Sequence, residues 1–197
     1  MSLELTVTVI HDGDPDPPPR SDLTGGFEQM GEGCNSSVLV DQIYFLSLPA
    51  GVESHLVSSF ADRFLAGAPA SRAEVHAGIE FPVRPPEEAS IVVLRRPGVM
   101  DPVEGSVLHA LADAGLDVEN CSVKTALRYR ISAPSLTRDG LELFAESRLG
   151  NGVVDEWHCF LPGEVDRVPD PFRSERGGAC RGADGECRRC EAAGDLR

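Results

Sequence analysis

Residues 91–111 read IVVLRRPGVMDPVEGSVLHAL, and this stretch decides the fold because it joins a strand to a helix through a defined corner. Its β-branched start predicts a short apolar strand over residues 90–94. Pro97-Gly98 is typical of a turn. Asp101 then stands where a helix N-cap belongs, and Pro102 stands at the first helical position. The stretch therefore predicts a strand, a corner and a helix in close succession.

The helix predicted after this corner has both a start signal and a stop signal. Glu104 follows Asp101 by three residues, which is the spacing of a capping box. Gly115 is a natural C-cap. The apolar stripe between them consists of Val103, Val107, Leu108, Leu111 and Ala114.

A second strand and a second helix follow. Residues 123–131 alternate with a period of two, which predicts a half-buried strand. One face carries Val123, Thr125, Leu127, Tyr129 and Ile131, and the other carries Lys124, Ala126, Arg128 and Arg130. Ser135 is expected to cap a helix whose inward residues are Leu141, Phe144, Ala145 and Leu149 and which Gly150 closes. With a last strand over 153–160, the unit is β-α-β-α-β.

The first half of the chain repeats the later part of this unit. Residues 37–49 (SVLVDQIYFLSLP) lie over 122–134 (SVKTALRYRISAP), so that Tyr44 falls 85 positions before Tyr129. Matches at this spacing are Ser37 with Ser122, Val38 with Val123, and Pro49 with Pro134. The segment FADRFL from Phe60 lies over FAESRL from Phe144, with the spacing changed by one. These matches indicate an internal duplication. The first copy is then expected to have a helix with inward Val52, Leu56, Phe60 and Phe64 and a last strand over 73–76.

The predicted fold class is α+β, with two such units whose helices pack on a largely antiparallel sheet. Residues 1–84 form the first unit, which opens with a strand and is incomplete because 12–33 is an acidic, Pro-rich loop in place of a leading helix. Prolines in 82–89 predict an extended linker. Residues 85–162 form the second unit. Residues 163–197 lose all periodicity and are expected to be a disordered tail.

Composition excludes several classes of function. The formal charge is −14 and the pI is near 4.7, which argues against nucleic acid or an anionic membrane as partner. No apolar run approaches the roughly 20 residues of a membrane-spanning helix. The N-terminus lacks a basic region and a cleavage site, so we expect a cytoplasmic protein.

The stretch 90–160 resembles the small S subunit of phosphoribosylformylglycinamidine synthase, a purine-biosynthetic enzyme. The matching corner and helix positions are Pro97, Gly98, Val99, Asp101, Pro102, Gly105, Val107, Ala110, Leu111 and Gly115. The later segments LFAESRLGN and GVVDEWHCF fit the same pattern. The duplication also resembles the N-terminal domain of the fused large synthase, in which two copies within one chain do what an S-subunit dimer does elsewhere. The first copy departs from the family pattern, since it has no Pro-Gly-Val corner.

The resemblance implies a non-catalytic, assembly role in an ATP-dependent carbon–nitrogen ligase, which converts formylglycinamide ribonucleotide to its amidine with ammonia from glutamine. It implies that ATP and Mg²⁺ belong to a partner synthetase and a Cys nucleophile to a partner glutaminase. This chain then has no catalytic, cofactor-binding or metal-binding residues. Its partners are those two subunits, with self-association left open. The expected structural and interface motif is Arg96, Pro97, Gly98, Val99, Asp101, Pro102, Gly105, Arg128, Tyr129 and Arg130.

The residues themselves agree with a chain that has no active site. GGFEQMGEG, residues 25–33, lacks the lysine of a phosphate-binding loop. His158 and Cys159 are neighbours on a strand and should face opposite sides, so they do not form an acid–thiol pair. Arg95-Arg96 suits a solvated or partner-facing role better than phosphate binding, since Asp101 would repel an anion. Arg128 and Arg130 are expected to form a polar sheet face, available to an acidic partner surface, and Tyr129 and Trp157 to pack in the sheet.

Two other functions stay open. One is a small-metabolite-sensing αβ regulatory module, of the kind in which ferredoxin-like repeats bind a metabolite at a dimer seam. The other is a zinc-dependent adaptor that uses Cys180, Cys187 and Cys190, although three thiols fall short of the four ligands of a closed zinc site.

Overall fold

The computed structural model describes residues 2–11, 37–66, 71–133 and 135–172, and over these ranges the protein is α+β. In chain order the elements are β1 (Ser2–His11), β2 (Ser37–Pro49), α2 (Ser54–Phe60), β3 (Ser71–Ala77), β4 (Ala89–Arg95), α3 (Glu104–Asp113), β5 (Ser122–Ser132), α4 (Arg138–Phe144) and β6 (Asp155–Phe160). Helices α2 and α4 each continue into a π-helical turn, η1 (Ala61–Leu65) and η2 (Ala145–Leu149).

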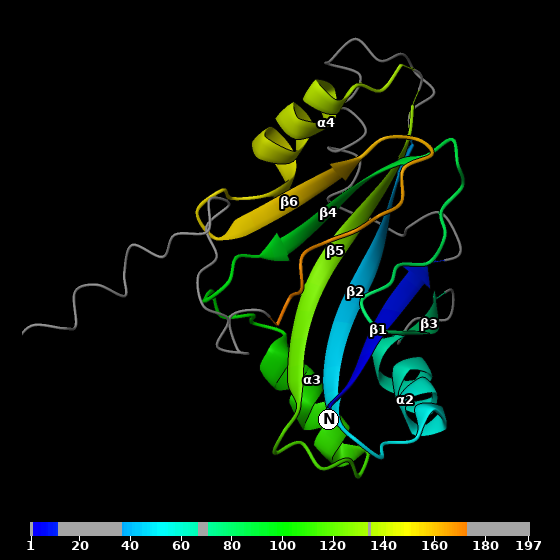
Figure 1. The fold of residues 1–197 in the computed structure, drawn as a ribbon, viewed down its shortest axis with the longest axis vertical. Helices are drawn as coiled ribbons and strands as arrows, with labels where there is room; N and C mark the ends of the chain where they lie inside the picture. Colours follow the sequence, from blue (N-terminus) through cyan, green and yellow to red (C-terminus); the bar gives the residue numbers. More distant parts are fainter. Residues whose placement is uncertain (1, 12–36, 67–70, 134, 173–197) are drawn as a thin grey trace, which may run out of the picture.

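The strands form one sheet in the order β3-β1-β2-β5-β4-β6, and each neighbouring pair is antiparallel (Figure 1). In each half the first strand lies between the other two, and β2 and β5 join the halves. Gln42 lies opposite Leu127, which is 85 positions later and is therefore its own counterpart in the repeat. The two units are thus related by a pseudo-two-fold axis that passes between these residues.

The helical face of the sheet buries two equivalent apolar clusters, and this equivalence is the physical content of the sequence repeat. The first consists of Leu5, Val7, Val9, Tyr44, Leu46, Leu48, Val57, Phe60, Ala61, Val107, Leu111 and Val123. The second consists of Val38, Val40, Ala89, Ile91, Val93, Tyr129, Ile131, Leu141, Phe144, Ala145 and Cys159. Helices α2 and α3 cover one end of the sheet and α4 covers the other (Figure 1). Helix α3 belongs to the second unit and packs on β5, and its buried residues share the first cluster with residues of β1 and β2, so the two units interlock.

The other face of the sheet is covered by two extended segments instead of helices. Residues 78–88 follow β3 and residues 161–172 follow β6, and their apolar side chains pack on a third cluster. That cluster consists of Ile43, Phe45, Val92, Leu94, Ala126 and Phe172, with Ile79, Phe81, Phe160 and Val168 packed against it. The predicted linker is therefore part of the fold. The prediction of a disordered tail is wrong for residues 163–172, which pack on the sheet. Residues 173–197 and the predicted loop 12–33 lie outside the described residues.

The predicted stripe of the first helix is wrong in two of its members. Leu56 and Phe64 are 45% and 40% exposed, whereas Val57, Phe60 and Ala61 are buried. Phe60 faces inward as expected, but the chain changes to π-helical geometry at Ala61. The Phe64 ring still stacks on the Phe60 ring, with the ring centroids 5.4 Å apart, while 40% of the Phe64 side chain stays exposed.

The second unit's helix is also bounded differently from the prediction. Thr137, not Ser135, is the N-cap, and its hydroxyl accepts the N–H of Gly140 at 3.2 Å. Gly150 ends η2 in an extended conformation, so no left-handed cap is formed. A Cβ at Gly150 would lie 3.1 Å from a ring carbon of Trp157, and close packing on that ring is the reason for glycine here. Among the described residues no helix is long and apolar enough to cross a membrane.

Candidate functional site

The corner between β4 and α3 is exposed, and its turn forms as predicted. The N–H of Val99 bonds to the carbonyl of Arg96 at 3.0 Å, and Gly98 has φ +84°. A turn with left-handed geometry at its third residue is typical of a type II turn, which requires glycine there. The corner places Met100 in solvent with 84% of its surface exposed. It therefore presents an apolar side chain on a rigid turn.

The arginines of this corner are tied to the start of β6. Arg95 pairs with the carboxylate of Asp155, and the Nε of Arg96 donates to the Asp155 carbonyl at 3.0 Å. The Arg96 N–H bonds to the Val154 carbonyl at 2.9 Å. Both side chains remain exposed, which is consistent with the expected solvated or partner-facing role.

Asp101 does not cap the helix in the predicted way. The helix begins at Glu104, two residues after the exposed Pro102. Asp101 is buried and connects the corner to β5 by hydrogen bonds. One carboxylate oxygen accepts the N–H of Val103 at 2.9 Å, and the other accepts the N–H and the hydroxyl of Thr125 at 2.7 and 2.8 Å.

The other predicted features of the helix also differ. Glu104 pairs with Lys124 at 3.0 Å and does not reach back to the cap. Gly105 is exposed on the first turn, with nothing within 4 Å of a Cβ placed there. Gly115 ends the helix as predicted, at φ +86°.

Arg128 is the largest correction to the predicted interface motif. Its side chain is 2% exposed, so it is not available to a partner surface. It lies directly opposite Asp41 in the β2–β5 register, and its Nε and Nη2 donate to one Asp41 oxygen at 2.9 and 2.6 Å. Its Nη1 donates to the Pro82 carbonyl at 2.8 Å. The extended segments cover this side of β5. The alternation of apolar and polar residues over 123–131, which predicted a polar outer face, therefore corresponds to a second buried face.

Arg130 belongs to the same buried network. Its Nε lies 3.0 Å from Asp41, and its Nη1 lies 3.2 Å from Glu88. One carboxylate, Asp41, thus contacts two guanidinium groups at the junction of the units, and Glu88 and Asp166 contribute further negative charge beside them. Tyr129, between the two arginines in sequence, points to the helical face and is buried there, as predicted.

Arg84 fastens the two extended segments to each other. Its Nε donates to Asp166 at 3.0 Å, its Nη2 donates to the carbonyls of Leu161 and Glu164 at 2.9 and 2.8 Å, and its Nη1 donates to the Glu88 carbonyl. These four hydrogen bonds use four of the five N–H groups of the guanidinium. The side chains of Arg84 and Asp166 are 5% and 4% exposed.

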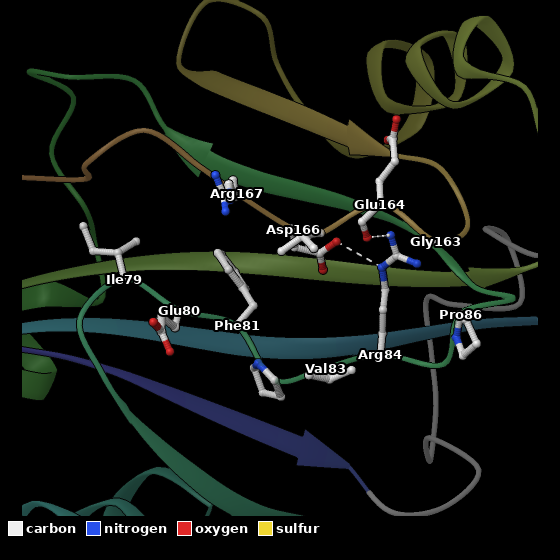
Figure 2. A pocket seen from close by; sticks show the side chains of 12 residues that line it. Ile79, Glu80, Phe81, Val83, Arg84, Pro86, Gly163, Glu164, Asp166 and Arg167 are labelled. Carbon is white, nitrogen blue, oxygen red and sulfur yellow. Dashed lines mark hydrogen bonds and ion pairs between the residues drawn. The ribbon is translucent and has the colours of Figure 1, made fainter.

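Above this pair lies a pocket of about 430 Å³ between the two extended segments. Figure 2 shows the Arg84–Asp166 ion pair at one end of the pocket and Phe81 at its centre. Its lining residues are Ile79, Glu80, Phe81, Pro82, Val83, Arg84 and Pro86 from the first segment, and Gly163, Glu164, Val165, Asp166 and Arg167 from the second. Since the two segments follow equivalent strands of the two units, the pocket lies where the units meet.

Cys159 and Tyr44 are in environments that suppress ionisation of their side chains. Cys159 faces the helical cluster, where burial above all, and then the nearby Glu142 carboxylate, raises the pKa of its thiol to about 12. Burial, followed by the charge of Asp101, also raises the pKa of the Tyr44 hydroxyl. Trp157 donates its indole N–H to Glu142 at 3.0 Å. A buried thiol at such a pKa is not a nucleophile at neutral pH.

Within the described parts of the chain, no group of three or more His, Cys, Asp or Glu side chains is placed to hold a metal ion. The three cysteines considered for zinc, Cys180, Cys187 and Cys190, lie outside those parts.

A scan against protein-family models gives no match to the chain, and a search of curated proteins gives none either.

The residues that sequence reasoning missed are Asp41, Arg84, Glu88 and Asp166. Asp41 carried a signal, because it interrupts the apolar run SVLVDQIYFLSLP. Pairing that run with its repeat copy around Gln42 and Leu127 would have placed Asp41 against Arg128. The other three lie in segments without periodicity, where side-chain positions depend on tertiary contacts.

Proposed function

We propose that this chain is a non-catalytic assembly component of a phosphoribosylformylglycinamidine synthase, which docks a synthetase and a glutaminase onto one rigid block. The proposal rests on the resemblance of residues 90–160 to the S subunit. The observation that supports it best is the pairing of the two units, since β2 and β5 meet around a pseudo-two-fold axis. A duplicated unit that replaces a dimer should be joined in this way.

The corner offers the docking surface. Its exposed residues follow one another around a single turn and are Arg96, Pro97, Gly98, Met100 and Pro102. Asp101 holds that turn against β5 by a hydrogen bond to Thr125. An exposed apolar side chain with charged neighbours on a rigid loop is a suitable interface anchor. Arg128 is not part of this surface and acts in holding the units together.

The test is reconstitution with the synthetase and glutaminase chains from the same genome. We expect glutamine-dependent amidine formation to fall sharply when this chain is omitted, while activity with free ammonia is retained. Met100→Asp should weaken co-purification with the partners, and Leu56→Asp, at an exposed apolar position on α2, is the matched control. Unchanged glutamine-dependent activity without the chain would contradict the proposal.

A second candidate is a module that senses a small metabolite, and the pocket between residues 79–86 and 163–167 favours it. Its volume lies within the range of about 300–1,000 Å³ that is usual for small-molecule sites. Binding of a metabolite to the isolated chain with a Kd below about 1 mM, which corresponds to roughly 4 kcal/mol, would support this function.

A further inference from the structure

The pocket between the extended segments has unused apolar surface. Val83 is 99% exposed and Val165 is 70% exposed, and they come from opposite segments. Ile79, Phe81 and Pro86 add further apolar wall. Ligand sites are mostly apolar, with a few polar groups that fix the orientation of the ligand.

The buried ion pair in the pocket does not supply those polar groups. The Arg84 guanidinium donates to Asp166 and to backbone carbonyls from both segments. One Asp166 oxygen accepts from Arg84 and from the Ser90 hydroxyl at 2.7 Å, and the other is buried and lies 3.5 Å from Arg128. The positive charge of Arg84 and the negative charge of Asp166 are therefore paired with each other, and together they form a floor of the pocket without net charge.

Two other charges at the pocket are uncompensated. Glu80 and Arg167 are exposed, and neither has an ion-pair partner within the ranges that the structure describes. Glu164, the remaining acid, is already held by Arg138, which donates to both of its oxygens at 2.8 Å. In Figure 2 Glu80 and Arg167 both lie at the Ile79 end of the pocket, away from Pro86. The pocket thus offers one free anion and one free cation beside an apolar wall.

We propose that this pocket binds a zwitterionic, amino-acid-like molecule with a large apolar side chain. The ligand carboxylate pairs with Arg167, its ammonium group pairs with Glu80, and its side chain lies against Phe81 and Val165. A ligand with a single charge would leave one of the two protein charges unpaired. This inference rests on the second candidate function and is independent of the assembly role.

The test uses the full-length chain and isothermal titration with three probes: L-phenylalanine, 2-phenylethylamine, which lacks the carboxylate, and 3-phenylpropionate, which lacks the ammonium group. Phenylalanine should bind most tightly, and each analogue about threefold to tenfold more weakly, as expected for a charge-assisted contact at a partly exposed site. Alanine should bind at least tenfold more weakly than phenylalanine, because it buries little apolar surface.

Variants connect each charge to one ligand group. Arg167→Ala should weaken phenylalanine and 3-phenylpropionate by about threefold to tenfold and leave 2-phenylethylamine unchanged, and Glu80→Ala should do the reverse. Val165→Asp should weaken all three probes. The controls Arg63→Ala and Glu119→Ala, at exposed positions outside the pocket, should change none of them.

Three results would overturn the inference. The first is the absence of phenylalanine binding up to 10 mM (about 2.7 kcal/mol), with a far-UV spectrum that shows a folded chain. The second is an equal effect of Arg167→Ala and Glu80→Ala on all three probes. The third is binding of a purine intermediate, but not of any amino acid, that Val165→Asp removes; the sensing function would then stand and the ligand class named here would be wrong.

Discussion

Replacing Asp41 with alanine tests whether the buried network holds the two units together. Asp41 is 1% exposed and accepts hydrogen bonds from Arg128 and Arg130. Its removal leaves the Arg128 guanidinium buried, with only the Pro82 carbonyl in hydrogen-bond contact and the Asp166 carboxylate 3.5 Å away. Breaking a buried ion pair from one side costs about 3–5 kcal/mol. Because Asp166 compensates part of the charge, we expect a loss near the lower end, about 3 kcal/mol.

Removing the other partner should cost less. In Arg128→Ile, Asp41 still accepts from Arg130 at 3.0 Å, so no charge is left without a partner, and we expect a loss of about 1–2 kcal/mol. The double variant Asp41→Ala/Arg128→Ile should recover at least about 1.5 kcal/mol relative to Asp41→Ala, since apolar replacement of a buried pair is often neutral. Ile43 and Ala126 lie opposite each other at the symmetry-related position and serve as the template for this pair.

The assay is chemical denaturation followed by fluorescence of Trp157, the one tryptophan in the chain, and by far-UV circular dichroism. Arg72→Ala removes an exposed ion pair with Glu74 and should cost less than about 1 kcal/mol, which calibrates the measurement. The reasoning is refuted if Asp41→Ala costs no more than Arg128→Ile, or if the double variant loses the sum of the single effects.

Three further predictions concern single positions. Gly150→Ala should destabilise the fold by about 1–3 kcal/mol and shift the Trp157 emission, because the new methyl group lies 3.1 Å from the indole ring; Gly152→Ala, whose nearest atom is 3.6 Å away, is the control, and equal effects of the two would contradict this packing. Asp101→Asn should cost about 1–3 kcal/mol in denaturation experiments, because an amide nitrogen would replace the oxygen that accepts from Thr125; a smaller loss in Thr125→Val is expected, and a neutral Asp101→Asn would show that this bond is dispensable. Cys159 should resist alkylation at pH 8 in the native state and react on unfolding, since a pKa of about 12 leaves roughly one thiol in 10⁴ ionised; fast native labelling, read by peptide mass mapping, would rule out this environment.

The sequence was sufficient to predict the strands β2 and β5 and the equivalent core residues on the helical face of the sheet. Period-two alternation predicted β5, and the run SVLVDQIYFLSLP coincides with β2 from Ser37 to Pro49. The repeat spacing of 84 or 85 predicted which residues occupy equivalent places, and Phe60 and Phe144 do so in the two clusters. These predictions succeeded because burial of one face imposes a period that short-range sequence carries.

The far face was not predictable by the same means. The segments 78–88 and 161–172 have no hydrogen-bonding ladder and no period, so their places follow from side chains such as Arg84 and Phe172 that meet partners far away in sequence. A period-two strand covered on both sides looks the same in sequence as one with a solvated face when its second face is built from arginines. Arg128 was therefore expected to be exposed although it is buried.

The same arginines also specify which strands pair at the junction. On the helical face the two units are nearly alike, so the apolar residues alone would also permit the β5 strands of two separate chains to pair around Leu127. Val123 of one strand would then lie opposite Ile131 of the other, and apolar residues would still face each other. On the far face that pairing would set Arg128 against Ala126 and Arg130 against Lys124. The buried guanidinium groups would then lack the Asp41 carboxylate, and like charges would lie opposite each other. Two copies of β2 around Gln42 would set Asp41 against Ile43. The pairing of β2 with β5 alone brings Asp41 to Arg128, so the polar residues make the association of the first unit with the second specific, while the apolar residues of the helical face make it stable.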